Sequence, residues 1–169
     1  MHWIYLIFAF FFALRLATLA FSIRNEKRLL QLGAVQYGRR NSLLLTLAHV
    51  AYYAGSLYEA YVHHTSLDGI AILGASIMGF AYAVLFYVIY RLRDVWTVKV
   101  YIVPHQRIET SFLFRTVRHP NYILNILPEL VGVAMLCHAW CTLALGLPVY
   151  CVILAVRIVQ EERAMRDLW

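Results

Sequence analysis

Five long apolar runs dominate this chain and limit its fold more than any other feature. Each run is long enough to cross a hydrocarbon core of about 30 Å as an α-helix. The segments between them carry nearly all of the charge. The runs are Trp3 to Ile23, Ser42 to Val62, Ile70 to Leu92, Tyr122 to Trp140 and Thr142 to Val159. The sequence therefore predicts an all-α integral membrane protein, built as a bundle of about five transmembrane helices.

The composition supports a membrane protein and argues against a soluble one. Hydrophobic residues make up 62% of the 169 residues and charged residues only 14%, whereas soluble domains carry about 25% charged residues. No Gly/Ser/Pro-rich linker or fixed-period repeat interrupts the chain, so we expect one domain over residues 1–169. No basic stretch precedes the first run and no small-residue cleavage site follows it, so we expect that run to be a helix and not a removable signal peptide.

The distribution of Lys and Arg predicts the orientation in the membrane. Of the 15 such residues, 14 fall in three regions that lie on one side of the predicted bundle. Short cytoplasmic loops collect positive charge, so we expect an N-out, C-in topology, in the inner (plasma) membrane if the chain is bacterial. The formal net charge of +6 then reflects topology and attraction to anionic membrane lipids. No aromatic-basic pattern on a soluble module supports binding to nucleic acid.

Two sequence features bear on how the helices pack. Four small residues recur at four-residue spacing in the third run, which favours close contact of one helix face with a neighbour. They are Ala71, Ala75, Gly79 and Ala83. Pro128 and Pro148 lie inside the last two runs, and each removes a backbone donor and tends to kink its helix.

The segment from Arg93 to Arg118 is longer than a connector in so small a bundle needs to be. Its middle is rich in β-branched and aromatic residues. We expect an amphipathic flap on the inner membrane surface, with Trp96 and Tyr101 at the level of the lipid headgroups and Lys99 reaching water.

Two histidine-containing clusters lie near the predicted outer turns. Cys137-His138-x-x-Cys141 supplies one His and two Cys, and His63-His64 with Asp68 supplies few ligands that face the same way. A structural zinc site needs four protein ligands. We therefore expect no metal site, with the cysteines packing as small apolar residues.

Polar residues gather where the last two runs meet the inner surface. Arg118 to Tyr122 opens one run, and Arg157 with Glu161 and Glu162 closes the other. Charges at such a boundary need partners or a polar ligand. Arg157 and Glu161 are one helical turn apart and can pair. The alternative is an ion pair that only caps the last helix, with Arg118 extending to the lipid headgroups.

These motifs resemble a known family. Arg-His-Pro-Asn-Tyr at 118–122, Trp-Thr-x-x-Val at 96–100 and Arg-x-x-x-Glu-Glu at 157–162 are similar to hallmark elements of the isoprenylcysteine carboxyl methyltransferase family. Asn-Glu-Lys at 25–27, Gly-Ala-x-x-Tyr-Gly at 33–38 and Pro-Glu-Leu at 128–130 further resemble its small bacterial branch. The resemblance spans nearly the whole chain, and the segment 105–114 departs from the family pattern.

The resemblance implies a membrane enzyme that uses S-adenosylmethionine to methylate a carboxylate or hydroxyl of a prenylated or other lipid-like acceptor. It implies a cofactor site at the inner face, formed by helix ends. The implied cofactor-binding residues are Arg118, His119, Pro120, Tyr122, Glu161 and Glu162. A Gly-x-Gly-x-x-Gly fingerprint is absent from the sequence, which argues against a Rossmann cofactor site.

The chemistry of the acceptor decides which residues are candidates for catalysis. A carboxylate is already anionic and needs alignment more than a base, whereas a hydroxyl needs a proton acceptor. The catalytic candidates are His119, Arg157 and Glu129, and we favour His119 over Glu129 as the base. Asn121 and Asn125 share a helix face with Glu129, where they either line the acceptor's passage or hydrogen-bond between helices.

Other charged residues within the runs leave a second class of function open. Arg15 can pair with Glu59, and we assign both, with His49, to stability of the bundle. The alternative function is a non-catalytic small transporter or accessory subunit, in which Glu59, Glu129 and the histidines form a polar path.

Overall fold

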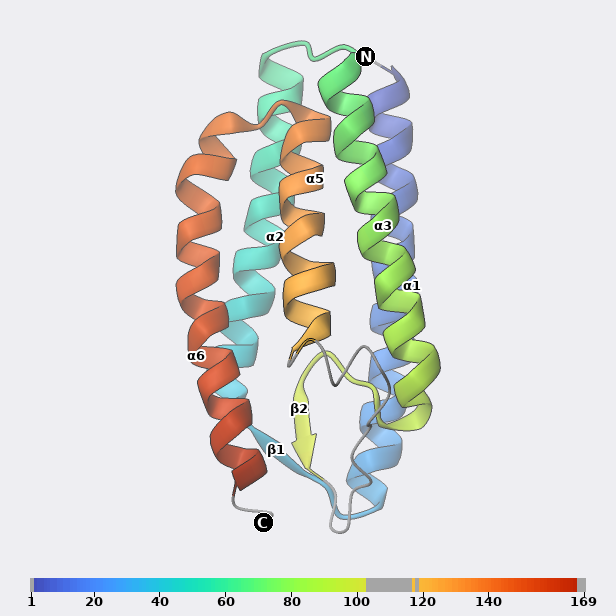
Figure 1. Cartoon of the computed structure of the whole chain (residues 1–169), viewed down its shortest axis with the longest axis vertical. Helices are drawn as coiled ribbons and strands as arrows, with labels where there is room; N and C mark the ends of the chain where they lie inside the picture. The colour runs from blue at the N-terminus through green and yellow to red at the C-terminus, as the bar shows by residue number, and fades with distance from the viewer. Residues whose placement is uncertain (1, 103–116, 118, 167–169) are drawn as a thin grey trace.

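The computed structural model describes residues 2–102, 117 and 119–166. Long helices run side by side, and the N-terminal end of the first lies at the opposite end of the bundle from the end of the last (Figure 1). The elements are α1 (His2–Gln31), β1 (Val35–Tyr37), α2 (Arg39–Val62), α3 (Gly69–Leu92), η1 (Arg93–Val95), β2 (Val100–Ile102), η2 (Asn121–Ile126), α5 (Leu127–Cys137), η3 (Thr142–Gly146) and α6 (Leu147–Arg166). The predicted all-α membrane bundle is confirmed.

The helices differ in whether each is long and apolar enough to span a membrane. Three segments are both long and apolar enough to span it, at His2–Gln31, Gly69–Val95 and Thr142–Ala164, and the apolar helix Asn121–Cys137 is shorter. Large apolar side chains cover the outside of the bundle, among them Phe10, Leu47 and Leu145, each more than half exposed. So much exposed apolar surface indicates contact with lipid.

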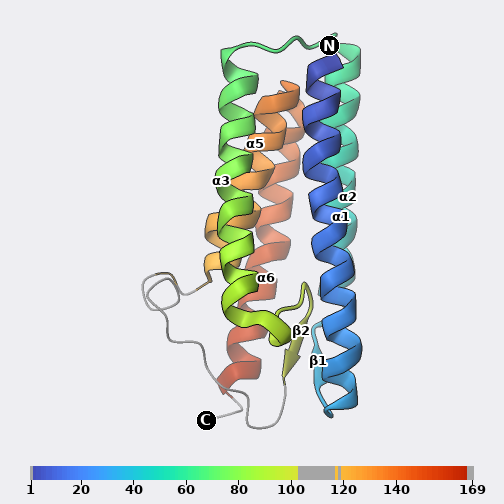
Figure 2. The same ribbon diagram turned by 90° about the vertical axis from the view of Figure 1, so that its right-hand side faces the viewer.

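α5 is the central helix. It contacts α3, α2 and α1, and both views show it among the other helices (Figures 1 and 2). Its most extensive contact is with α3, where Gly74 and Gly132 bring the two backbones together. A Cβ atom at Gly74 would lie 2.6 Å from the Gly132 carbonyl oxygen. The predicted small-residue face was therefore only partly right, because Ala71 is buried whereas Gly79 and Ala83 are exposed.

The two intrahelical prolines each follow a wider helical turn. The π-helical segments η2 and η3 end two residues before Pro128 and Pro148. A proline cannot donate to the carbonyl four residues earlier, and its ring clashes with that carbonyl. A π turn shifts the bonding by one residue, as where the Leu127 N–H donates to the Tyr122 carbonyl. The distortion that the sequence predicted at Pro128 and Pro148 is thus a local widening of each helix.

α1 continues two turns beyond the end predicted for the first run. It ends where Gly33 takes a positive φ of 81°, and the Ala34 N–H bonds back to the Leu29 carbonyl at 3.0 Å. Glycine at this position commonly ends a helix. The prediction stopped before Arg24, where a cluster of charged residues begins, but charge does not break a helix, so α1 extends past the apolar run.

A two-stranded sheet includes part of the segment predicted to form a flap on the membrane surface, and residues 103–116 and 118 of that segment lie outside the described residues. β1 pairs with β2 in antiparallel register, with Gln36 opposite Tyr101. Trp96, predicted to lie among headgroups, is only 3% exposed and packs beside Phe21 with ring centroids 6.2 Å apart. The β-branched residues of this segment form a strand because a partner strand is available.

Candidate active site

Residues 119–122 of the Arg-His-Pro-Asn-Tyr motif lie where the helical segment made of η2 and α5 begins. Pro120 already has helical dihedrals, with φ −62° and ψ −34°, and proline favours the first turn of a helix. The His119 carbonyl accepts hydrogen bonds from the N–H groups of Tyr122 and Ile123, both at 3.1 Å. These bonds fix the positions from which the side chains of His119 and Tyr122 extend. Arg118 and residues 103–116 lie outside the part of the chain that the structure describes.

Tyr122 connects the start of η2 to the end of α6. Its hydroxyl donates to Glu161 Oε2 at 2.6 Å and accepts from Arg157 Nε at 3.4 Å. The predicted direct pairing of Arg157 with Glu161 is thus replaced by contacts that both make with one hydroxyl. Because Tyr122 is only 8% exposed, this hydroxyl links a cation and an anion out of contact with bulk solvent.

His119 and Glu162 form a second contact between the same two helices. Their Nε2 and Oε1 atoms are 3.3 Å apart. The His119 ring also stacks on the Tyr122 ring, with centroids 5.8 Å apart and planes inclined by 23°. The structure therefore brings His119, Tyr122, Glu161 and Glu162 together, as the sequence predicted they would be for a shared site.

Arg157 is the most deeply buried charge of this cluster, with 1% exposed. Its Nη1 donates to Ser42 Oγ at 2.6 Å, and its Nη2 donates to the Val98 carbonyl at 3.0 Å. These acceptors belong to the start of α2 and to the segment before β2. The direction of the guanidinium is therefore set by parts of the chain far from it in sequence.

Gly38 allows α2 to begin close to α6. It has a positive φ of 63°, and a Cβ atom there would collide with Gln160 Oε1. Any other residue would be strained at this φ, and the Gln160 side chain would have to move to make room for it. This close approach places Ser42 within reach of Arg157.

Polar residues near the C-terminal end of α1 hold the segment that precedes β2, a role that the sequence did not predict for them. The contacts join Asn25 Nδ2 to the carbonyls of Arg93 (2.9 Å) and Trp96 (2.8 Å), the Val98 N–H to Ser22 Oγ (2.9 Å), and Lys99 Nζ to Glu26 Oε2 (2.7 Å). Ser22 and Glu26 are one helical turn apart with Asn25 between them, and this polar face is the signal that could have revealed them. Lys99, predicted to reach water, keeps 41% of its side chain exposed and also forms an ion pair with Glu26.

Tyr101 lies next to this ion pair on β2. Partial burial, reinforced by the nearby Glu26 carboxylate, raises the pKa of the Tyr101 phenol above its ordinary value. The phenol therefore stays neutral at physiological pH.

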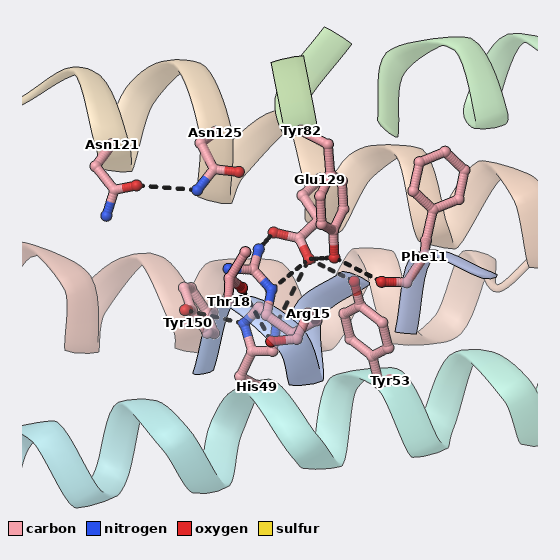
Figure 3. A network of polar contacts seen from close by, with 10 residues as sticks. All are labelled: Phe11, Arg15, Thr18, His49, Tyr53, Tyr82, Asn121, Asn125, Glu129 and Tyr150. Atoms are coloured by element: carbon pink, nitrogen blue, oxygen red, sulfur yellow. Dashed lines mark hydrogen bonds and ion pairs between the residues drawn. The ribbon is translucent and has the colours of Figure 1, made fainter. Parts of the chain in front are cut away.

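Glu129 lies in a separate polar network inside the bundle (Figure 3). It forms an ion pair with Arg15, whose Nε is 3.0 Å from Oε1. The same oxygen accepts hydrogen bonds from the hydroxyls of Tyr53 at 2.5 Å and Tyr82 at 3.2 Å. Three donors therefore stabilise the ionised carboxylate, and Glu129 is the one predicted catalytic residue placed away from the cluster at the helix ends.

The predicted pairing of Arg15 with Glu59 is wrong. Glu59 accepts hydrogen bonds from the N–H groups of Cys141 at 3.0 Å and Thr142 at 2.6 Å, at the start of η3. Free N–H groups at a helix start attract a carboxylate. Sequence spacing could not distinguish this partner from Arg15, because both contacts join distant helices.

The residues at the helix ends fit the chemistry of S-adenosylmethionine. That cofactor carries an ammonium, a carboxylate, a sulfonium and an adenine. Glu161 and Glu162 supply two adjacent carboxylates suited to the ammonium, and His119 supplies a ring nitrogen suited to a carboxylate or a ribose oxygen. The stacked rings of His119 and Tyr122 offer an aromatic surface to a planar base.

Comparison with known proteins gives consistent results. The model of the isoprenylcysteine carboxyl methyltransferase (ICMT) family matches residues 72–167. An uncharacterized protein from Haemophilus influenzae is 52% identical over 162 residues, covering 96% of this chain and 94% of that protein. The uncharacterized protein YpbQ from Bacillus subtilis is 23% identical over 163 residues, covering 96% of each chain. No solved structure matches this chain.

The matched range includes both halves of the cluster, from His119 and Tyr122 at one helix start to Arg157, Glu161 and Glu162 at the other helix end. It covers more than half of the chain, and the apolar bundle agrees with an integral membrane protein. The chain therefore belongs to the isoprenylcysteine carboxyl methyltransferase family, a family of membrane methyltransferases.

Proposed function

We propose that this protein uses S-adenosylmethionine to methylate a carboxylate or hydroxyl of a lipid-like acceptor at the inner surface of the membrane. The observation that carries this proposal is the meeting of Tyr122 with both Arg157 and Glu161, beside the His119–Glu162 contact. Family membership supports the methyl transfer. Lys and Arg residues are concentrated at the end of the bundle where this cluster lies, which supports a site that faces the cytoplasm.

Each residue of the cluster has a role that its contacts support. Bound S-adenosylmethionine would supply a methyl group attached to a positively charged sulfur, and this sulfur is a good leaving group. Glu161 and Glu162 hold the ammonium group, and His119 and Tyr122 contact the nucleoside. Arg157 presents a buried positive charge of fixed direction, which attracts an anionic acceptor and aligns it.

The need for a base depends on the acceptor. A carboxylate needs none, because it is already ionised at neutral pH. For a hydroxyl acceptor, His119 is the base that we favour, since its ring lies at the candidate site, where its Nε2 contacts the Glu162 carboxylate at 3.3 Å and so holds the ring in position. Glu129 is less suited to this task, because its carboxylate already accepts from Arg15, Tyr53 and Tyr82.

Binding of S-adenosylhomocysteine to the purified protein in detergent tests the cofactor site. A ligand at 100 times its dissociation constant stabilises the folded state by about 2.7 kcal/mol, so the wild type should show a clear rise in melting temperature. Glu161→Gln and His119→Ala should lose most of that rise. The matched control is Asp94→Asn, which neutralises an exposed carboxylate paired with Arg28 and should retain it. A wild type that shows no rise at millimolar ligand contradicts the proposal and favours a non-catalytic bundle.

The acceptor group is tested by transfer of a radiolabelled methyl group to a lipid extract. Label that is released by mild alkali is a methyl ester, so the acceptor is a carboxylate, whereas label that resists alkali is an ether formed on a hydroxyl. For a hydroxyl acceptor, His119→Gln should lower kcat at saturating S-adenosylmethionine and flatten the pH dependence of kcat. For a carboxylate acceptor, the same variant should leave the pH dependence of kcat unchanged.

A further inference from the structure

Three buried polar side chains near the C-terminal end of α1 form a patch to which the proposed function gives no role. Ser22, Asn25 and Glu26 are 0%, 3% and 7% exposed. They are three or four positions apart, so they share one helix face. All three lie before residue 72, where the family match begins. Buried polar groups need partners, and the partners of this α1 patch show what it holds.

The α1 patch holds the chain before, at and after Val98. The contacts join Asn25 Nδ2 to the Trp96 carbonyl (2.8 Å), Ser22 Oγ to the Val98 N–H (2.9 Å) and Glu26 Oε2 to Lys99 Nζ (2.7 Å). Ser22 Oγ also donates to Glu26 Oε1 at 3.3 Å, so these two members of the patch hold each other. The position of Val98 is therefore set by α1.

A strained turn at the end of α3 makes this support necessary. Arg93 has a φ of 45° and a ψ of −113°, a combination that residues other than glycine rarely adopt. Such a conformation persists only where its surroundings hold it. Asn25 Nδ2 donates to the Arg93 carbonyl at 2.9 Å as well as to Trp96. The α1 patch thus holds both ends of the segment that leads from α3 to Val98.

Val98 joins α1 to the arginine of the candidate active site. Its N–H bonds to Ser22, and its carbonyl accepts from Arg157 Nη2 at 3.0 Å. β2, which begins two residues later, lies between the C-terminal ends of α1 and α6 in both views (Figures 1 and 2). A guanidinium donates its hydrogen bonds in a rigid planar fork. The position of Val98 therefore affects the direction in which Arg157 presents its charge.

We propose that Ser22, Asn25 and Glu26 are positioning residues that act on the methyl acceptor through Val98 and Arg157. This inference rests on the proposed function, in which Arg157 attracts the acceptor and aligns it. Displacement of an aligning group by about 1 Å can lower a rate on the order of 100-fold. Loss of the α1 patch should therefore slow methyl transfer and leave the binding of the cofactor intact.

Thermal denaturation in detergent tests the link between α1 and Arg157 without depending on activity. Ser22→Ala leaves the Val98 N–H without its acceptor, and Arg157→Lys replaces the planar fork by one ammonium group. Each variant should lower the melting temperature. The double variant should lose less than the sum of the two losses, because both substitutions break one chain of contacts. Fully additive losses overturn the link.

Thr18→Val is the matched control for this cycle. Thr18 lies one turn before Ser22 on α1 and is also buried, at 4% exposure, but its hydroxyl bonds within its own helix, to the Arg15 carbonyl at 2.9 Å. Its effect on the melting temperature should add to that of Arg157→Lys. Equal departures from additivity for Thr18→Val and Ser22→Ala also overturn the link.

Initial rates of label transfer to the lipid extract, at saturating S-adenosylmethionine, test the consequence for the acceptor. Ser22→Ala should lower kcat/KM for the extract on the order of 10- to 100-fold, while the thermal shift by S-adenosylhomocysteine stays close to wild type. Asn25→Asp keeps the size of the side chain but cannot donate when ionised, and should act in the same way. Thr18→Val should retain the wild-type rate.

The outcomes separate this inference from the proposed function. Equal rates in Ser22→Ala and Thr18→Val overturn the positioning role, as does a joint loss of rate and of the shift by S-adenosylhomocysteine in Ser22→Ala. A wild type that transfers no label contradicts the proposed function, and the melting temperatures alone then decide whether α1 and Arg157 are linked.

Discussion

The Tyr122 hydroxyl shows how a single atom can organise the candidate active site. It contacts an acidic and a basic residue of α6, and its ring packs on His119. Without it, Arg157 and Glu161 would keep their places on one helix but lose their common link to η2. The geometry of both helix ends therefore depends on this residue.

Tyr122→Phe removes the hydroxyl and keeps the ring. We expect the free energy of unfolding to fall by about 1–2 kcal/mol, because the buried Arg157 and the partly buried Glu161 each lose a partner. The thermal shift by S-adenosylhomocysteine should fall as well. Both are measured by thermal denaturation in detergent. Tyr87→Phe is the control, since Tyr87 is 43% exposed on the outside of the bundle, and an equal effect in the two variants would contradict this role of Tyr122.

At the residue scale, the sequence identified most of the cluster but few of its partners. His119, Tyr122, Glu161 and Glu162 could be predicted because charged residues at a membrane boundary need a reason to be there. Ser42 could not, because nothing in a serine at the start of a helix indicates that it accepts from an arginine 115 positions later. Partners across helices depend on how the helices pack, which spacing alone does not specify.

Among the elements, α3 and α5 form the contact that most limits substitution. Gly74 and Gly132 allow the backbones of the two helices to approach closely. η2 leads directly into α5, and Glu129 lies in the first turn of α5. Movement of α5 away from α3 would therefore shift the start of the candidate site as well as the Glu129 network.

Gly74→Ala should destabilise the protein, because its Cβ atom would lie 2.5 Å from the Leu136 backbone nitrogen. Overpacking of this kind costs about 1–3 kcal/mol. Gly79→Ala is the matched control on the same helix, because a Cβ atom there meets nothing within 4 Å. That variant should be neutral or more stable by about 0.4–1 kcal/mol. Comparable losses of thermal stability in the two variants would contradict the close contact.

Asp68 connects two elements at the other end of the bundle. Its Oδ1 accepts from the Ala71 N–H at 2.8 Å, at the start of α3, and lies 3.1 Å from His138 Nε2, at the end of α5. The Ala71 hydrogen bond, and then the charge of His138, lower the pKa of the Asp68 carboxyl.

A lowered pKa in the folded state makes Asp68 stabilising above its unfolded pKa, which is near 3.9. This contribution is lost as the pH falls below that value toward the lower folded pKa. We therefore expect thermal stability in detergent to fall between about pH 4 and pH 3. Asp68→Asn can still cap the helix but does not titrate, so it should show a smaller fall over the same range. An identical fall would show that other groups cause the acid sensitivity.

At the scale of the whole molecule, the bundle was predictable and the small sheet was not. Long apolar runs predict helices that cross a membrane. The five predicted runs are largely helical in the structure, and three helices are long and apolar enough to span a membrane. The pairing of 35–37 with 100–102 joins two short segments about 65 positions apart. Neither segment is long enough to be recognised as a strand without its partner.

The orientation in the membrane is a separate prediction of the charge distribution. A reporter enzyme that is active only outside the cytoplasm should be active when fused after Thr65 and inactive when fused after His105. A reporter that fluoresces only in the cytoplasm should give the opposite pattern. The reason is that 14 of the 15 Lys and Arg residues lie on the His105 side of the helices. Activity of the first reporter at both positions would contradict this topology.

The contacts of Arg157 with Ser42, and of β2 with β1, cross the boundary at which the family match begins. The range that the family model matches, residues 72–167, is therefore not a unit that could be removed or exchanged by itself. Consider a chimera that joins the first 71 residues of one homologue to the remainder of another. Its residue 42 must still bond to its residue 157, and its strand 35–37 must still pair with its strand 100–102. Recombination at this boundary should otherwise yield misassembled hybrids, even when every helix of the hybrid inserts correctly.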